Sequence, residues 1–95
     1  MAVLLQVSVI SGTHDQFDEL DDRVGQAMEE AGGPPPGLMS HVVYPDGDGF
    51  VVADVWRTES EGSSFVDDVL RPLLAELHLK AGETTARPVW SFARP

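Results

Sequence analysis

The sequence predicts a single α+β domain over residues 1–95, with the ferredoxin-like order strand, helix, strand, strand, helix, strand. Three observations predict this order. An apolar run opens the chain, two segments carry apolar residues at helical spacing, and turn residues at 45–49 separate two further apolar runs. Both helices are expected to cover one face of a four-stranded antiparallel sheet.

The first strand and the first helix follow from local signals. Residues 3–10 are rich in Val, Leu and Ile, as in a strand that is buried on both faces. Thr13 and Gln16 form a capping box that begins a helix. Gly32 and Gly33 end this helix, and the three prolines that follow prevent its continuation. Between these limits runs one apolar stripe: Phe17, Leu20, Val24, Ala27 and Met28.

A hairpin is predicted next, and its register is open. Its strands and turn are expected at 38–44, 50–56 and 45–49 respectively. If Tyr44 pairs with Phe50, His41 is the only polar side chain on an aliphatic face and Asp54 lies on the other face. A one-residue bulge instead places His41 beside Asp54. The two registers give two different site models.

The second helix has two candidate starts and one expected irregularity. Thr58 with Glu61, and Ser64 with Asp67, are rival capping pairs. Pro72 lies within the helix, so we expect a kink or break near Leu70-Arg71. Lys80 and Gly82 are expected to close the segment. The buried stripe consists of Phe65, Val69, Leu70, Leu73, Leu74 and Leu77.

The strands are apolar on both sides, which predicts a partner for the uncovered face of the sheet. The last strand is expected over 84–92, where Pro88 indicates an edge or bulged position. The helices can cover only one face, and an antiparallel face that meets water usually alternates with polar residues. We therefore expect a homodimer formed by sheet-to-sheet packing, since most soluble oligomers are symmetric.

Charge and composition exclude several function classes. The chain has 16 acidic and 6 basic residues and a net charge of −10, so nucleic acids and anionic membranes would be repelled. The absence of cysteine excludes disulfides, thiolate chemistry and Cys-ligated metal. The apolar start is shorter than the roughly 20 residues of a membrane span. It also lacks the basic residues and cleavage site of a signal peptide, so a cytoplasmic location is expected.

The stretch "PPPGLMSHVVYPDGDGFVVADVW", residues 34–56, resembles small dimeric α/β-barrel proteins common in actinobacteria. These are similar to the antibiotic biosynthesis monooxygenase superfamily, and the resemblance covers nearly the whole chain. It implies two ferredoxin-like subunits packed sheet to sheet, each with a pocket for a small apolar ligand. It also implies relatives of several kinds, among them cofactor-free oxygenases, haem degraders, dehydratases and cyclases. The motif specifies the fold more than the chemistry.

Six residues are candidates for a site. By their match to this group, His41 and Asp54 are the catalytic candidates, with His41 moving a proton and Asp54 orienting it. Their structural alternatives are a core histidine bonded to backbone and a carboxylate paired with Arg57 or Arg87. The ligand-binding candidates are Trp56, Tyr44, Phe65 and Phe17, all of which can equally serve as packing residues.

No metal or cofactor is expected. The three histidines, His14, His41 and His78, do not have a metal-ligand spacing, and His78 comes too late in the second helix to match the haem-ligand histidine of haem degraders. Three functions remain open. One is a cofactor-independent enzyme acting on a small apolar aromatic or polyketide-like molecule. The others are a non-catalytic ligand-binding or accessory dimer, and a structural or regulatory module.

Overall fold

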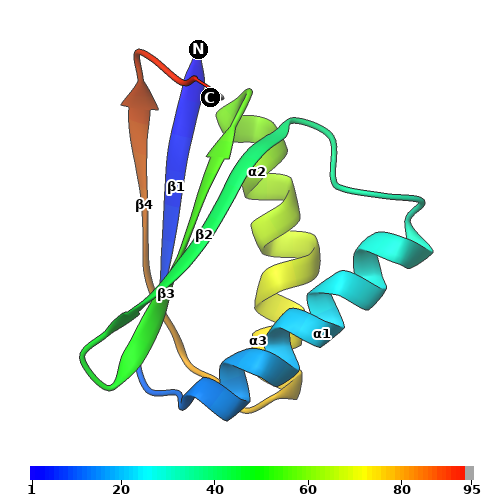
Figure 1. Ribbon diagram of the computed structural model, residues 1–95, viewed down its shortest axis with the longest axis vertical. Helices are drawn as coiled ribbons and strands as arrows, with labels where there is room; N and C mark the ends of the chain where they lie inside the picture. The colour runs from blue at the N-terminus through cyan, green and yellow to red at the C-terminus, as the bar shows by residue number, and fades with distance from the viewer. Residues whose placement is uncertain (94–95) are drawn as a thin grey trace.

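The computed structural model describes residues 1–93 and confirms the ferredoxin-like α+β fold (Figure 1). The strands are β1 (Ala2–Val9), β2 (Leu38–Asp46), β3 (Gly49–Trp56) and β4 (Ala81–Val89). The helical segments are α1 (His14–Glu30), α2 (Glu59–Phe65), the π-helical turn η1 (Val66–Leu70) and α3 (Arg71–Glu76). Within residues 1–93, none of the helices combines the length and the apolar character needed to cross a bilayer.

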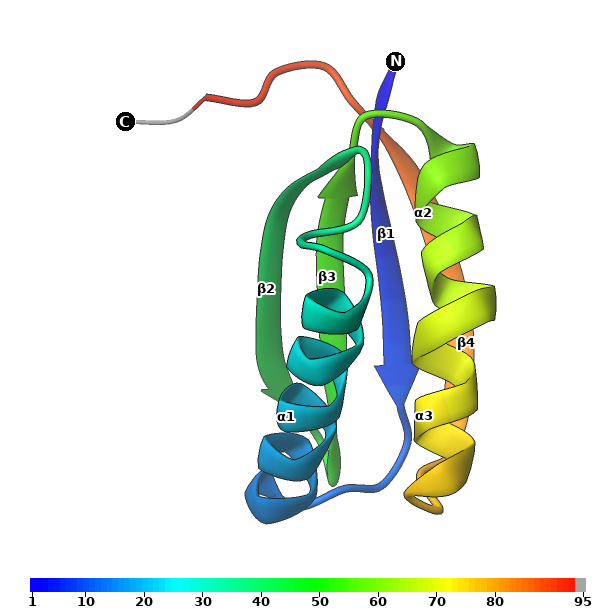
Figure 2. The same ribbon diagram turned by 90° about the vertical axis from the view of Figure 1, so that its right-hand side faces the viewer.

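The strands form one antiparallel sheet in the order β2-β3-β1-β4. Figure 2 shows α1 in front of β2 and β3, and the helix made of α2, η1 and α3 in front of β1 and β4. Alternate residues of β1 face the helices and are buried: Val3, Leu5, Val7 and Val9. The core therefore lies between the sheet and a single layer of helices.

The hairpin register matches the alternative in which His41 lies beside Asp54, and the register that pairs Tyr44 with Phe50 is wrong. Tyr44 pairs with Val51, and His41 pairs with Asp54. The irregularity lies at Met39, between Leu38 and Ser40, and not in the turn. The turn itself is tight, because Asp46 pairs directly with Gly49 and Gly47 adopts a φ of +57°.

The second helix begins at the first of its two candidate starts. The Thr58 hydroxyl accepts a hydrogen bond from the Glu61 N–H, so Thr58 is the N-cap and Ser64 lies inside the helix. The expected irregularity near Pro72 is the turn η1, in which the Arg71 N–H bonds the Val66 carbonyl. This wider turn lies directly before Pro72, which has no N–H to donate. The helix ends at Glu76, earlier than the sequence predicts.

The last strand starts and ends three residues before its predicted position. It covers Ala81–Val89, and it is an edge strand, as Pro88 indicates. Trp90, Ser91 and Phe92 lie outside the sheet in a C-terminal arm, and Trp90 is 92% exposed. Figure 2 shows this arm crossing the end of the sheet and projecting beyond the edge formed by β2.

Candidate functional site

An apolar pocket lies between α1, the strands β2 and β3, and the second helix. Its lining residues are Phe17, Leu20, Asp21, Val24, Met28, Leu38, His41, Val43, Val52, Asp54, Phe65 and Leu70. Only about 20 Å³ of this pocket is wide enough to admit a water molecule. That space holds about one water, so a larger ligand would have to move the walls apart.

His41 and Asp54 form the polar centre of this pocket. They lie opposite each other on β2 and β3, and the distance between Nδ1 of His41 and Oδ1 of Asp54 is 2.6 Å. An ionised carboxylate only accepts hydrogen bonds, so Nδ1–H donates and Nε2 is left as the basic nitrogen. No residue of the described chain, 1–93, makes a hydrogen bond to Nε2.

Asp54 is buried and His41 is partly exposed, and this difference determines which of the two side chains can reach a ligand. The Asp54 side chain is 7% exposed and the His41 side chain is 45% exposed. The hydrogen bond to Asp54 raises the pKa of His41 above 6.5; the charges of Asp54 and Asp21 raise it further, while partial burial acts to lower it. A basic imidazole that is held in one tautomer and open on its other side is arranged to accept a proton.

Four of the six residues predicted for the site line this pocket: His41, Asp54, Phe17 and Phe65. Trp56 and Tyr44 do not. Trp56 is completely buried behind the pocket wall, where its ring lies 5.5 Å from that of Phe65. Tyr44 lies on the opposite face of the sheet, where its hydroxyl accepts a hydrogen bond from the Gln6 amide at 3.1 Å. In these positions Trp56 supports a lining residue, and Tyr44 belongs to the uncovered face.

Asp21 is the polar lining residue that the sequence prediction does not include. It is an exposed side chain on α1, yet it borders the pocket. Its position carried a usable signal, because Asp21 follows Phe17 by four residues and precedes Val24 by three. Residues at these spacings share one face of a helix. A carboxylate within the apolar stripe could have been recognised as part of the site.

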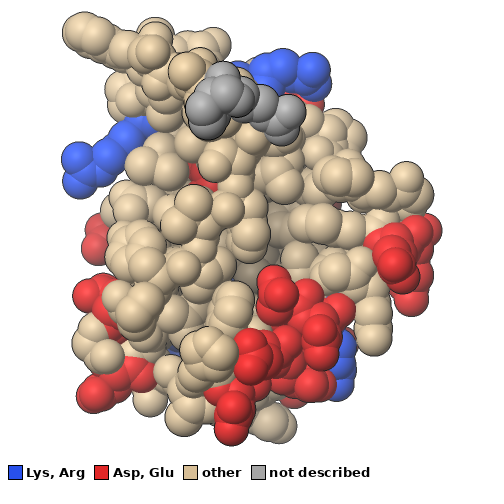
Figure 3. All heavy atoms as spheres, viewed as in Figure 1, with Lys and Arg blue, Asp and Glu red and all other residues tan. Residues whose placement is uncertain are grey.

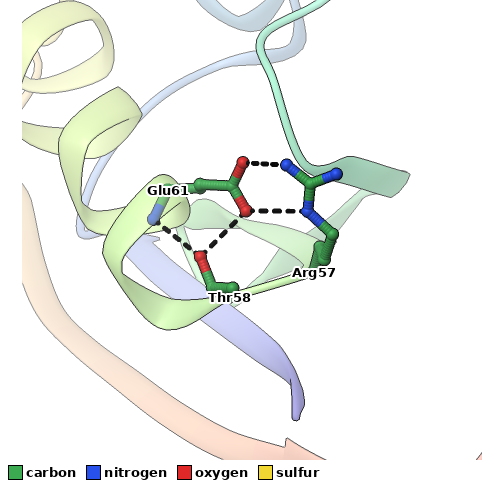
Figure 4. Close-up of polar contacts among 3 residues, drawn as sticks. All are labelled: Arg57, Thr58 and Glu61. Atoms are coloured by element: carbon green, nitrogen blue, oxygen red, sulfur yellow. Dashed lines mark hydrogen bonds and ion pairs between the residues drawn. The ribbon is translucent and has the colours of Figure 1, made fainter.

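A hydrogen-bonded clamp of Arg57, Thr58 and Glu61 lies at the start of α2 (Figure 4). The Arg57 guanidinium donates two hydrogen bonds to the Glu61 carboxylate, which also accepts one from the Thr58 hydroxyl. These bonds lower the pKa of Glu61. The Arg57 backbone N–H bonds the Gly37 carbonyl at 2.7 Å. Gly37 has a φ of +86°, and a Cβ there would lie 2.6 Å from the Glu61 carboxyl carbon. The clamp thus fixes the connector that leads into the lining residue Leu38.

The other histidines lie away from the pocket. His14 contacts Asp18 at 3.3 Å on the surface of α1, where both side chains are exposed. His14, Asp15 and Asp18 bring potential ligand atoms within 4.8 Å of one another. Such exposed acidic groups are common without an ion. His78 lies in the turn after the second helix, in a left-handed conformation with a φ of +57°.

The fold and the pocket define a class: a ferredoxin-like domain whose helices and sheet enclose a small apolar site with one His–Asp pair. No protein-family model and no curated protein sequence matches this chain. Solved structures do match, over 90% to 100% of the chain, and several are described as candidate antibiotic biosynthesis monooxygenases.

Three of these structures illustrate the similarity. SnoaB, a cofactor-independent oxygenase from Streptomyces nogalater, is 14% identical with a TM-score of 0.63, covering 96% of this chain and 94% of its own. A candidate antibiotic biosynthesis monooxygenase from Deinococcus radiodurans is 13% identical with a TM-score of 0.60, covering 100% and 98%. Another from Chloroflexus aurantiacus is 18% identical with a TM-score of 0.59, covering 96% and 97%. The chain therefore has the fold of antibiotic biosynthesis monooxygenases.

Proposed function

We propose that this protein is a cofactor-independent enzyme that removes a proton from a small, mostly apolar aromatic or polyketide-like substrate. The observation that carries the proposal is the His41–Asp54 pair, which lines a mainly apolar pocket. The similarity to SnoaB, described as a cofactor-independent oxygenase, supports the reaction class.

His41 and Asp54 have different roles in the proposed reaction. Nε2 of His41 accepts a proton from an acidic C–H or O–H group of the substrate. The imidazolium that forms is stabilised by the buried Asp54 carboxylate, which also holds the ring in place. For an activated CH₂ group, the resulting carbanion adds O₂, and the peroxide anion takes the proton back from the His41 imidazolium to give a hydroperoxide. The hydroperoxide loses water to leave a carbonyl, so that one oxygen atom enters the product and the other leaves as water.

A homodimer is part of the same proposal. The face of the sheet away from the helices exposes Val42 and Tyr44, which are 52% and 40% exposed. The C-terminal arm adds Trp90 at one end of the sheet. Apolar patches of this kind mark interaction surfaces, and a second copy with the same face is the simplest partner. We propose that two sheets pack face to face, with the arm reaching the other subunit.

Oxygen uptake tests the proposed reaction. The purified protein is offered a panel of naphthols, hydroquinones and anthrones, and O₂ consumption is recorded for wild type, His41→Ala and His14→Ala. We expect turnover of at least one compound, a loss of about 10²- to 10⁴-fold in kcat for His41→Ala, and no change for His14→Ala, which lies outside the pocket. Equal turnover by wild type and His41→Ala would disprove the role of His41.

The small size of the cavity favours a second candidate, a non-catalytic ligand-binding or accessory dimer. Room for about one water is little for a substrate, unless the walls move on binding. In that case His41 would form a hydrogen bond to a ligand without removing a proton from it. A compound that binds with one molecule per subunit and is recovered unaltered would support this candidate over the enzyme.

A further inference from the structure

The pocket carries a negative charge that the proton-transfer proposal does not use. Asp21 extends from α1 and lines the pocket together with Phe17 and Val24 of the same helix. Apart from the His41–Asp54 pair, Asp21 is the only polar residue among the lining residues that the structure describes. Its side chain is exposed, so it lies at the boundary between the apolar interior and water.

The charges around the pocket do not cancel. A protonated His41 neutralises Asp54, which leaves the charge of Asp21; with neutral His41, two negative charges remain. Neither Lys nor Arg lines the pocket within residues 1–93. The arginines of the helical layer and of the β3–α2 junction are paired with acidic side chains: Arg23 with Glu19 and Glu76, Arg57 with Glu61, and Arg71 with Asp67.

The surface beside the pocket has the same sign. Figure 3 shows the molecule hollowed between the edge of the sheet and α1, with acidic side chains gathered on the α1 side. The exposed acidic residues of this helix are Asp15, Asp18, Glu19, Asp21, Asp22, Glu29 and Glu30. A recess bordered by one sign of charge repels ions of that sign and lowers their local concentration.

We propose that Asp21 is a charge filter that restricts the pocket to uncharged ligands and excludes carboxylates, sulfonates and phosphate esters. The substrate would therefore enter as a neutral molecule, free of any phosphate-bearing carrier, and would acquire negative charge only after His41 takes its proton. This inference rests on the proposed function only in requiring that the pocket binds a small apolar molecule; it does not require turnover.

Two dyes with one skeleton provide a matched test. N-phenylnaphthylamine is uncharged and apolar, and anilinonaphthalenesulfonate is the same aromatic skeleton with a sulfonate. Both are titrated into the protein while the NMR methyl signals of Val43 and Val52 are followed. These two residues line the pocket on β2 and β3, so their shifts report binding there and not on the exposed C-terminal arm. The variants are Asp21→Asn, Asp21→Lys and, as the control, Asp22→Asn.

The expected result is a preference for the uncharged dye that depends on Asp21. Removing one charge near the ligand should strengthen binding of the sulfonate about fivefold, the change that about 1 kcal/mol produces. Asp21→Lys reverses the charge and should strengthen it roughly twentyfold. Affinity for the uncharged dye should change much less than affinity for the sulfonate in both variants, so the ratio of the two affinities is the quantity compared. Asp22 is exposed on α1 and does not line the pocket, so Asp22→Asn should have a much smaller effect. Salt should weaken the discrimination.

Three outcomes separate this inference from the proposed function. Equal binding of the two dyes, or a ratio unchanged by Asp21→Asn, would overturn the charge filter and leave proton transfer by His41 intact. Failure of the uncharged dye to shift the signals of Val43 and Val52 would overturn the charge filter, and the oxygen-uptake test of His41→Ala would still decide the proposed function. Selectivity that depends on Asp21, combined with oxygen uptake unaffected by His41→Ala, would support the filter and reject the enzyme.

Discussion

Replacing His41 by Ala removes the only hydrogen-bond partner of the Asp54 side chain within the described residues. A buried ion pair that loses one partner costs about 3–5 kcal/mol, and an exposed pair contributes up to about 1 kcal/mol. The pair in this protein is intermediate, because the carboxylate is 7% exposed while the imidazole is 45% exposed. We therefore expect His41→Ala to lower the free energy of unfolding by about 2 kcal/mol at a pH below 6.5, where His41 is protonated.

The pH dependence of this contribution has a definite sign. The folded-state pKa of His41 is raised above 6.5, the value of an unperturbed imidazole. A raised histidine pKa means that the folded state binds the proton more tightly than the unfolded state. The stabilisation is therefore fully present below pH 6.5 and declines as the pH rises through the raised pKa.

A double-mutant cycle measures the interaction free energy between His41 and Asp54 separately from the other effects of each substitution. Urea unfolding is recorded for wild type, His41→Ala, Asp54→Asn and the double variant, below and well above the His41 pKa. The matched control is His14–Asp18, a pair at 3.3 Å whose side chains are 85% and 58% exposed. We expect a coupling of about 1.5–2 kcal/mol for His41–Asp54 at low pH and below about 0.5 kcal/mol for the control. A coupling no larger than that of the control, or one that grows with pH, would show that His41 and Asp54 do not stabilise the fold as an ion pair.

Four further predictions concern the fold and its assembly. Gly62→Ala should lower the free energy of unfolding by about 1–3 kcal/mol, because a Cβ there would lie 2.5 Å from Cδ1 of Leu5. In the same urea experiment Gly25→Ala should stabilise by about 0.5–1 kcal/mol, since no atom lies within 4 Å of its added Cβ. Thr58→Ala should cost about 1 kcal/mol by removing the N-cap of α2, and a thermal melt would show no shift if the cap is unimportant. Trp90→Ser should weaken the proposed dimer about tenfold or more in sedimentation without changing subunit secondary structure, whereas an unaltered dissociation constant would exclude the arm from the interface.

Local signals in the sequence were sufficient to predict the order of the elements. Thr13 with Gln16 begins α1 through the capping box that their spacing predicts, and Thr58 begins α2. These contacts join residues three apart, so they require no knowledge of the tertiary structure. Pro72 likewise predicts an irregular turn from its missing N–H alone, although the sequence does not specify that the turn is π-helical.

The hairpin register could not be decided from the sequence, and the site depends on it. The turn residues at 45–49 allow more than one turn length, and a shift of one residue moves His41 to the other face of the sheet. The structure adopts a tight turn and places the irregularity at Met39, where no glycine or proline indicates it. The sequence therefore predicts the pairing of His41 with Asp54 only as one of two alternative registers.

The C-terminal arm shows a different limit of sequence patterns. The sequence predicts a strand over residues 84–92, partly because Trp90 and Phe92 are apolar. In the structure the strand ends at Val89 and Trp90 is exposed to solvent. Apolar character indicates burial somewhere, but it does not distinguish burial within the sheet from burial against another subunit.

The proposed mechanism requires that Asp54 holds His41 as a base that faces the pocket. An NMR titration of the His41 imidazole in wild type and in Asp54→Asn tests it most directly. We expect a pKa above 6.5 in wild type, a lower pKa in Asp54→Asn, and a proton on Nδ1 in the neutral form. A wild-type pKa at or below 6.5 that does not respond to Asp54→Asn would contradict the claim, because the two residues would then not act as a pair.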